Sequence, residues 1–386
     1  MAWYNFNKKE KQEVKIGEGP LFSQFSTPFG KVGEGNLSLP YVRSYGAERW
    51  VRFGNDNLYP QLINQMYYQS PLHSTIINFK ANAVIGGGYE LTSNDTSGAQ
   101  KVKEYTFIKR NKFNKLLRQI TKDLIMHGRV CIIVEPYGND VRLERIGPEK
   151  VRNDRYKTVY TISDDWSRNM DMYELKPYRP NMTEKSLYVY EIDGDAGQDI
   201  YPIPSYCSAL NWVFVDGEMS YLHKSNIINS IFPSFMIKLA KKFGSQEEIN
   251  QFKDTINKAK GAPAAGRIMT FVANSEDQLP TIEPIPVNQN DKLFEQTDGR
   301  IDLQLSRAHS IDPLLVGIRT TGALGSGTDI QIAYTIFEKN VVMPLRAEIT
   351  DIANDLLMIG NLTTRITIND FQIVENQIVD KTNPNK

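Results

Sequence analysis

The stretch from His309 to Leu357 constrains the fold most, because it joins two helical patterns through a glycine-rich loop. The loop contains Gly322, Gly325 and Gly327, and glycine adopts positive φ angles that other residues avoid. Beyond it, apolar residues recur at helical spacing, and Pro344 inside that pattern is expected to kink or interrupt the helix. The recurring residues are Ile332, Ile336, Val342, Leu345, Ile349, Ile352 and Leu356. We therefore expect two packed helices joined by a loop with unusual backbone freedom.

The balance of charge restricts how this chain could meet nucleic acid. It has 386 residues, of which 40% are apolar, so it can build a sizeable core. Its 45 basic and 45 acidic residues cancel, and gripping DNA by bulk electrostatics needs a basic surplus. DNA that slides past without being gripped is not excluded. We expect Cys131 and Cys207 to be free thiols, and we find neither a signal peptide nor a membrane span.

Residues 60–203 have the pattern of an α+β domain with antiparallel hairpins. Ser70 and Pro71 are suited to begin a helix that three glycines end at 86–88. A second helix is expected from about Asn111 to His127. Short strands are expected at 130–134, 141–146, 159–162, 172–175 and 187–192. The residues before 60 lack sustained periodicity, and we interpret them as an extended arm.

Residues 204–311 predict two helices that enclose a small insert. The expected elements are a helix over 204–231, a strand over 234–239, a helix over 245–260, strands over 267–272 and 281–287, and a helix over 290–310. After Asn361 the pattern offers one alternating strand, from Thr363 to Ile373, and a polar tail.

These segments carry a resemblance to a known family. The run "SRAHSIDPLLVGI", the glycine-rich loop and the helix containing "FEKNVVMPL" resemble the C-terminal signature of tailed-bacteriophage portal proteins. The insert "GSQEEINQFKDTINKAKGAPAAGRIMTFV" is similar to the clip helix and following strand of that family. The resemblance covers roughly residues 60–358. Its strength lies in the order of elements, because no single motif is diagnostic.

The resemblance implies an α+β portal-like subunit in eight parts. The chain departs from the family after Asn361, where it offers only one strand and a tail, so we expect no large C-terminal helical crown of the kind that many members carry. The parts are an N-terminal arm (1–59), an α+β wing (60–203), a first stem helix (204–231), a strand–helix–strand clip (232–288), a second stem helix (289–311), a tunnel loop (312–328), a long kinked helix (329–360), and a C-terminal strand and tail (361–386).

The resemblance also implies a function. Portal proteins form a homo-oligomeric ring, usually a dodecamer, at one capsid vertex. The ring is a conduit for double-stranded DNA during packaging and ejection, without sequence specificity. It docks the large terminase and the head–tail connector or adaptor proteins, and it meets the major capsid or scaffold protein. The expected location is the virion, with assembly in the host cytoplasm, and no cofactor or membrane is implied.

The glycine-rich loop has three interpretations. A phosphate cradle would need a Gly-Lys-Ser/Thr ending after a strand, and the loop has no lysine. A linker without a ligand and a DNA-contacting loop both remain open. If the loop contacts DNA, the resemblance implies that Arg319, Thr320 and Thr321 touch DNA in the channel. The glycines Gly322, Gly325 and Gly327 would let the loop move.

The expected clip is basic, with seven basic and three acidic residues over 232–275. The basic residues are Lys238, Lys241, Lys242, Lys253, Lys258, Lys260 and Arg267. They either form a solvated surface or dock an acidic partner such as the packaging motor. The second stem helix is slightly acidic, and a channel wall of that kind would keep phosphates from sticking.

No catalytic or metal-binding pattern stands out in the sequence. The four histidines, at 73, 127, 223 and 309, are scattered, and none has a ligand spacing with another histidine or cysteine. We therefore expect no enzyme activity, no catalytic residue and no metal. A non-viral ring-forming scaffold and a nucleic-acid-processing enzyme are the alternatives to a portal.

Overall fold

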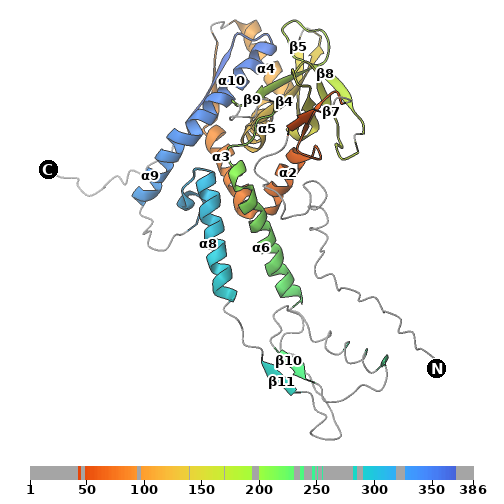
Figure 1. Ribbon diagram of the computed structural model, residues 1–386. Helices are drawn as coiled ribbons and strands as arrows, with labels where there is room; N and C mark the ends of the chain where they lie inside the picture. The colour runs from red at the N-terminus through yellow and green to blue at the C-terminus, as the bar shows by residue number, and fades with distance from the viewer. Residues whose placement is uncertain are drawn as a thin grey trace, which may run out of the picture. The chain divides into compact units, whose positions relative to one another are not determined.

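The computed structural model describes residues 42–44, 48–93, 97–138, 140–168, 170–193, 200–229, 235–238, 246–247, 250, 254, 281–284, 290–318 and 327–370 (Figure 1). The chain forms two compact units. The sheet unit comprises residues up to 62 together with 129–203, and the helical unit comprises 63–128 together with 204 onward. The fold is mixed α+β, as the sequence predicted.

The sheet unit is organised around a curled six-stranded sheet. Its strand order is β5-β4-β9-β8-β7-β6, and every pairing is antiparallel except the short parallel one between β8 and β9. The strands are β4 (Arg129–Tyr137), β5 (Asp140–Ile146), β6 (Val151–Asn153), β7 (Tyr160–Ile162), β8 (Tyr173–Pro177) and β9 (Ser186–Glu191). A separate pair is formed by β1 (Val42–Ser44) and β2 (Val51–Phe53), and a 3₁₀ turn, η1 (Pro148–Lys150), precedes β6.

All six strands contribute to one apolar core. On β4, Cys131 lies opposite Ile146 of β5 and Val189 of β9, so its small side chain packs in the centre of the sheet. The buried core residues are Cys131, Ile133, Ile146, Val151, Tyr160, Ile162, Leu175 and Leu187. Their alternation along the strands explains the successful sequence prediction, because side chains of a strand point to opposite faces.

A buried guanidinium ties strands and turns of the sheet unit together. Arg152 is fully buried and uses all five of its N–H donors. It donates to the side-chain and backbone oxygens of Asn57 at 2.7 and 2.6 Å, to the carbonyls of Glu149 and Val151 at 3.0 Å, and to Gln61 Oε1 at 3.3 Å. Its guanidinium also lies 4.9 Å from the centre of the Trp166 ring.

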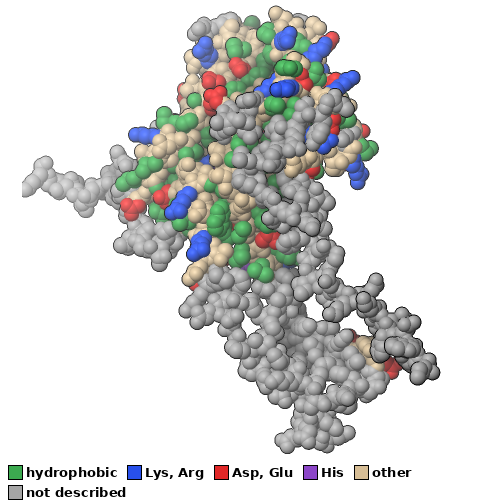
Figure 2. Space-filling model, in the orientation of Figure 1, with side chains coloured by type: hydrophobic (Ala, Val, Ile, Leu, Met, Phe, Trp, Pro, Cys, Tyr) green, Lys and Arg blue, Asp and Glu red, His purple; other side chains and the backbone are tan. Residues whose placement is uncertain are grey.

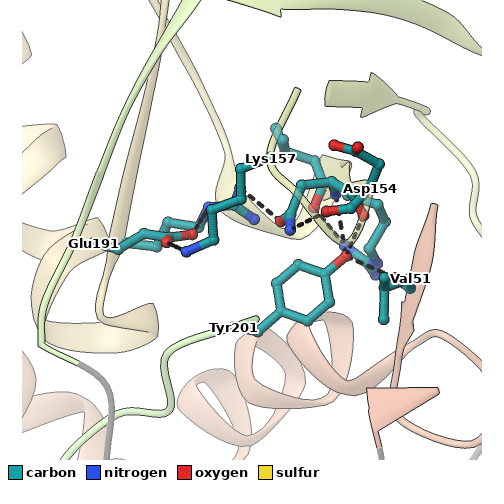
Figure 3. A network of polar contacts seen from close by, with 9 residues as sticks. Val51, Asp154, Lys157, Glu191 and Tyr201 are labelled. Atoms are coloured by element: carbon teal, nitrogen blue, oxygen red, sulfur yellow. Dashed lines mark hydrogen bonds and ion pairs between the residues drawn. The ribbon is translucent and has the colours of Figure 1, made fainter. Parts of the chain in front are cut away.

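Figure 3 shows the neighbouring part of this network around Tyr201. The Tyr201 hydroxyl donates to the Val51 carbonyl at 2.6 Å and accepts from the backbone N–H of Asn153 at 3.1 Å. Glu191 pairs with Arg129 at 3.0 Å and also with Lys157. Arg129, Arg152 and Glu191 therefore all have partners within the sheet unit.

The helical unit contains most of the helices. They are α2 (Tyr59–Gln69, which starts in the sheet unit), α3 (Pro71–Ile85), α4 (Gly98–Arg110), α5 (Phe113–His127), α6 (Leu210–Asn229), α8 (Asn290–Ala308), α9 (Gly327–Phe337) and α10 (Met343–Ile359), with 3₁₀ turns η2 (Cys207–Ala209) and η5 (Pro313–Val316). The strands are β3 (Tyr89–Thr92), β10 (Phe235–Lys238), β11 (Thr281–Pro284) and β12 (Arg365–Ile368).

Local signals in the sequence set the ends of α3. The Ser70 hydroxyl accepts from the backbone N–H of His73 at 3.1 Å, and Pro71 occupies the first helical position, as expected. At the other end, a side chain on Gly87 would lie 2.3 Å from the Asn369 carbonyl. A glycine is therefore required there, because the chain after β12 passes directly over this turn. β12 pairs antiparallel with β3, and Arg365 lies opposite Thr92, 273 positions away in the sequence.

The predicted interruption at Pro344 takes the form of a π-helical turn. The turn η6 (Glu338–Val342) joins α9 to α10, and Pro344 sits at the start of α10. Proline lacks the N–H that an α-helix needs and clashes with the preceding turn, and a wider turn relieves both problems. Arg346 then anchors α10 by donating to the carbonyls of Ala83 and Val84 at 3.1 Å, and it pairs with Glu338 at 2.7 Å.

Two helices were missed from the sequence. The sequence predicts an extended arm before residue 60, whereas β2 lies at Val51–Phe53 and α2 begins at Tyr59. α4 has one buried residue, Phe107, so it shows no apolar stripe for a periodicity argument to find. The predicted wing, 60–203, contributes to both compact units, because α3 and α5 pack with α10 in the helical unit.

Candidate functional site: the stem and the helices that flank the loop

The chain leaves the body of the helical unit on α6 and returns on α8. The two helices pack against each other, as Figure 1 shows. Between them in the sequence, β10 and β11 pair antiparallel, with Phe235 opposite Pro284. Helix, excursion and returning helix follow the order that the sequence predicted for stem, clip and stem. Gly217, at the middle of α6, does not break the helix.

Carboxylates gather between the two stem helices. Asp216 of α6 faces Asp298 and Asp302 of α8 in a pocket of about 220 Å³. Burial raises the pKa of Asp216, although a hydrogen bond from the Ser70 hydroxyl partly offsets this. Burial also raises the pKa of Asp302, and the charges of Asp216 and Asp298 raise it further. The remaining lining residues are Met219, Ser220, His223 and Ile301. The stem is therefore acidic where α6 meets α8.

The upper ends of the stem helices meet in a buried cluster that sequence reasoning missed. We call His73, Tyr206 and His309 the histidine junction. Nδ1 of His73 lies 2.9 Å from Nε2 of His309, although the two residues are 236 positions apart. The Tyr206 ring stacks on the His309 ring with 4.9 Å between the ring centres, and it meets the His73 ring edge-on with 4.7 Å between the centres. Its hydroxyl donates to the Met126 carbonyl at 2.7 Å. The junction ties α3, the end of α8 and the turn before α6 together.

Both histidines of the junction are neutral at physiological pH. Burial lowers the pKa of His73 to about 3, and Lys80 lowers it further. Burial, Lys80 and His73 lower the pKa of His309 well below its usual value. Lys80 is itself buried, which lowers its pKa to about 8. A neutral pair can share a single proton between the facing nitrogens, so the junction is a hydrogen-bonded structural contact.

The structure describes both flanks of the predicted tunnel loop. η5 is capped by Asp312, whose side chain accepts from the N–H of Leu314 at 2.9 Å, and it ends at Gly317 with φ of 84°. Gly327 is the first residue of α9. The other predicted loop residues, Arg319, Thr320, Thr321, Gly322 and Gly325, lie outside the described residues. Their proposed contact with DNA stays a prediction.

Most of the predicted clip also lies outside the described residues. Lys238 is the last residue of β10. The other basic residues, Lys241, Lys242, Lys253, Lys258, Lys260 and Arg267, are not among those the structure describes. In the part of the chain that is described, no group of three or more His, Cys, Asp or Glu residues is arranged to hold a metal ion. Likewise, none of the described helices is both long and apolar enough to cross a membrane.

Comparison with solved structures shows what this fold resembles. No protein-family model matches the chain. A chain in the neck of an empty gene transfer agent (GTA) particle, computed with C6 symmetry, matches with a TM-score of 0.56 and 14% identity over 81% of this chain and 84% of that one. A chain in the neck of the native GTA particle, computed with C12 symmetry, matches with a TM-score of 0.51 and 14% identity over 80% and 83%. An HK97-family phage portal protein from Corynebacterium diphtheriae gives a TM-score of 0.44 and 9% identity over 79% and 94%.

The matches to the GTA chains extend over both compact units, since they cover about four fifths of this chain. At 14% identity they establish a common fold rather than a common activity. The chain therefore shares the fold of the chains in gene transfer agent necks, and the α+β class that its sequence predicted is confirmed.

Proposed function

We propose that this chain is the subunit of a portal-type ring at a capsid vertex, through which DNA enters and leaves the particle. The shared fold carries this proposal, because it extends over 81% of the chain and the similar chains come from particle necks with C6 and C12 symmetry. The helical unit supports it with two packed helices, α6 and α8, that enclose the β10–β11 pair in the sequence, and with the helices α9 and α10 that follow. On this proposal the chain is a structural protein without catalytic activity.

The stem fits a channel that lets DNA pass. The carboxylates of Asp216, Asp298 and Asp302 gather on the two stem helices. A wall of that sign repels phosphates, and repulsion keeps DNA from adhering while it moves. The overall net charge of zero agrees with this, since DNA binding through phosphate neutralisation needs a basic surplus.

The assembly state of the purified protein tests the proposal. Each chain has a mass of 44.0 kDa, so a ring of the C12 kind would have about 0.5 MDa. We expect mass photometry to find that species and negative-stain images to show a ring with a central hole. Monomers alone, at high protein concentration and in several salts, would refute the portal proposal. Labelling this protein in assembled particles distinguishes a portal from a non-viral scaffold, because a portal is found at a single vertex of the capsid.

The loop from Arg319 to Gly327 is proposed to line the narrowest part of the channel and to touch DNA without reading its sequence. One arginine and two threonines per subunit would make weak contacts that break easily. Changing Gly322, Gly325 and Gly327 to alanine should leave rings intact and reduce the full-length DNA held in particles. Normal DNA content in particles with normal rings would make the loop a passive linker.

The clip is proposed as the docking face for the large terminase, and the neighbouring surfaces as those for the head–tail connector and capsid proteins. Changing Lys253 and Lys258 to glutamate should weaken terminase binding and leave the ring intact, because both changes reverse the sign of a basic module. Unchanged terminase affinity would mean that the basic residues of the clip form a solvated surface and do not dock the terminase.

A further inference from the structure

Helix α9 exposes apolar side chains that a subunit in water should cover. Ile332 and Ile336 are 54% and 56% exposed, and Ile330 is 40% exposed. The helix carries a single charge, Asp329, over its eleven residues. A helix with apolar residues on its outer side is normally buried against another element. The hydrophobic colour over α9 is visible in Figure 2.

The exposed surface of α9 divides into two lengthwise stripes. Ile332 and Ile336 are four residues apart and so share one face, which we call the isoleucine stripe. Gln331 and Thr335 share the adjacent face and are linked by a hydrogen bond from the Thr335 hydroxyl to the Gln331 carbonyl at 2.7 Å. Both stripes are exposed, but one is polar and the other apolar. Solvent alone therefore does not explain the isoleucine stripe.

The inner face of α9 already has its partner within the helical unit. Phe337 is buried, and its ring lies 5.6 Å from that of Phe79 on α3 and 6.4 Å from that of Tyr334. Beyond α9, η6 and α10 are held by the bonds of Arg346 to the carbonyls at the end of α3. The position of α9 is thus set from one side, and the isoleucine stripe remains available to another molecule.

We infer that the isoleucine stripe is a contact with a second copy of this chain, the next subunit of the ring. The inference rests on the proposed function and names the surface through which the ring closes. In a cyclic assembly, the share of the circle that each subunit occupies is smallest near the axis. Helices that flank a loop lining the channel therefore lie closest to the same helices of the neighbouring subunits. Contact is head to tail, so the stripe meets a different surface of the next subunit.

Twelve helices that pack side by side around an axis would leave an open channel between them. Helices pack with about 10 Å between their axes. Twelve of them therefore make a circle of roughly 120 Å circumference, and after subtraction of the helix radius a channel nearly 30 Å wide remains. A helix in that position has neighbours on two sides and water on the channel side. The polar Gln331 and Thr335 suit the water, and the isoleucine stripe suits a neighbour.

Replacing the stripe with charges tests this inference. The test variant is Ile332→Glu with Ile336→Glu, and the matched control is Gln331→Glu with Thr335→Glu. Both variants place two glutamates four residues apart on the same helix, and glutamate is a good helix former. We expect the control to form rings like the unchanged protein. The test variant should need at least ten-fold more protein for half-assembly, and its separated subunits should keep the circular dichroism of folded wild-type subunits.

A thiol at position 336 tests whether a neighbouring subunit covers the isoleucine stripe. In a protein with Cys207→Ser and Ile336→Cys, the new thiol should react with a maleimide at least ten-fold more slowly in rings than in separated subunits. Cys131 is buried and serves as the unreactive background. Equal protection in separated subunits would mean that another segment of the same chain covers the stripe, and this would overturn the inference.

The outcomes separate the inference from the proposed function. Rings of the unchanged protein together with equally stable rings of the test variant would overturn the inference and leave the portal proposal standing. An unchanged protein that forms no rings would overturn both. Loss of rings in the test variant alone, with a protected thiol in the assembled cysteine variant, supports both.

Discussion

Two buried polar clusters, one in each compact unit, are built in opposite ways. In the sheet unit, Arg152 is buried with its charge, and every N–H of the guanidinium has an acceptor. In the helical unit, the histidine junction is buried without charge, and Nε2 of His73 and Nδ1 of His309 have no hydrogen-bond partner among the described residues. A satisfied charge makes a rigid framework, whereas a neutral histidine pair can be charged by acid at the cost of stability.

This difference matches the proposed roles of the two regions. The Arg152 cluster joins β6 to the turn at Asn57 and the start of α2, which are parts of one framework. The histidine junction joins helices that lead to the stem and the loop. We expect the sheet unit to resist changes of pH and the helical unit to respond to them. Three predictions test this contrast, from the largest effect to the smallest.

Removing the guanidinium of Arg152 should have the largest effect. Arg152→Met leaves the carbonyls of Asn57, Glu149 and Val151 without their donor in a buried site. Each buried acceptor that is left without its donor costs about 1–3 kcal/mol. Urea unfolding measures the loss in the sheet unit when it is followed by the fluorescence of Trp166, which stacks on Arg152, in a background with Trp3, Trp50 and Trp212 changed to phenylalanine. The exposed Arg155→Met is the control, and a similar small change in both variants would contradict the assigned role.

Acid should destabilise the helical unit through the histidine junction. The fold lowers the pKa of His73 from 6.5 to about 3 and also lowers that of His309, so their stabilising effect is complete above pH 6.5 and is lost as the pH falls toward 3. Each histidine contributes a slope of up to about 1.4 kcal/mol per pH unit in that window.

The double variant His73→Asn with His309→Gln should flatten this slope. Asparagine and glutamine place amide groups near the two facing nitrogens and do not titrate. Thermal unfolding between pH 4 and 7, followed by loss of helical circular dichroism, measures the slope. The fluorescence of Trp166, in the same background without the other three tryptophans, is the internal reference for the sheet unit. An unchanged slope in the double variant would show that other groups control the acid response.

The stem carboxylates should act in the opposite direction, with a smaller effect. Burial and like charges raise the pKa of Asp302, so the stability linked to this group is present below pH 3.8 and is lost as the pH rises through its folded-state pKa. Asp302→Asn should therefore stabilise the helical unit at pH 7, by less than about 0.5 kcal/mol because water screens a side chain that is only partly buried. The exposed Asp351→Asn on α10 is the control. Destabilisation by Asp302→Asn would mean that the carboxylate has a favourable partner.

Much of the order of elements could be predicted because the signals are local. The Ser70 cap, Pro71 and Gly128 set helix ends within a few residues of where they lie, and alternation identified β4 and β5. α4 was not predicted because its sequence lacks an apolar stripe. β3 was not predicted because its partner, β12, lies more than 270 residues away. The predicted sites lie largely outside the described residues, so Arg319 to Gly325 and most of the clip lysines remain sequence-based predictions.

The sequence by itself determined the α+β class, the helices α6 and α8 and the ends of α3 and α5, since spacing, caps and turns act over a few residues. The tertiary structure decided which distant polar groups meet. Four histidines that are scattered along the chain became one buried pair and two separate residues, because packing of α3 against the end of α8 brought His73 to His309. It also decided that Ile332 and Ile336 face outward, since the same apolar spacing serves a core or an interface, and only the packing of Phe337 against α3 assigns the faces.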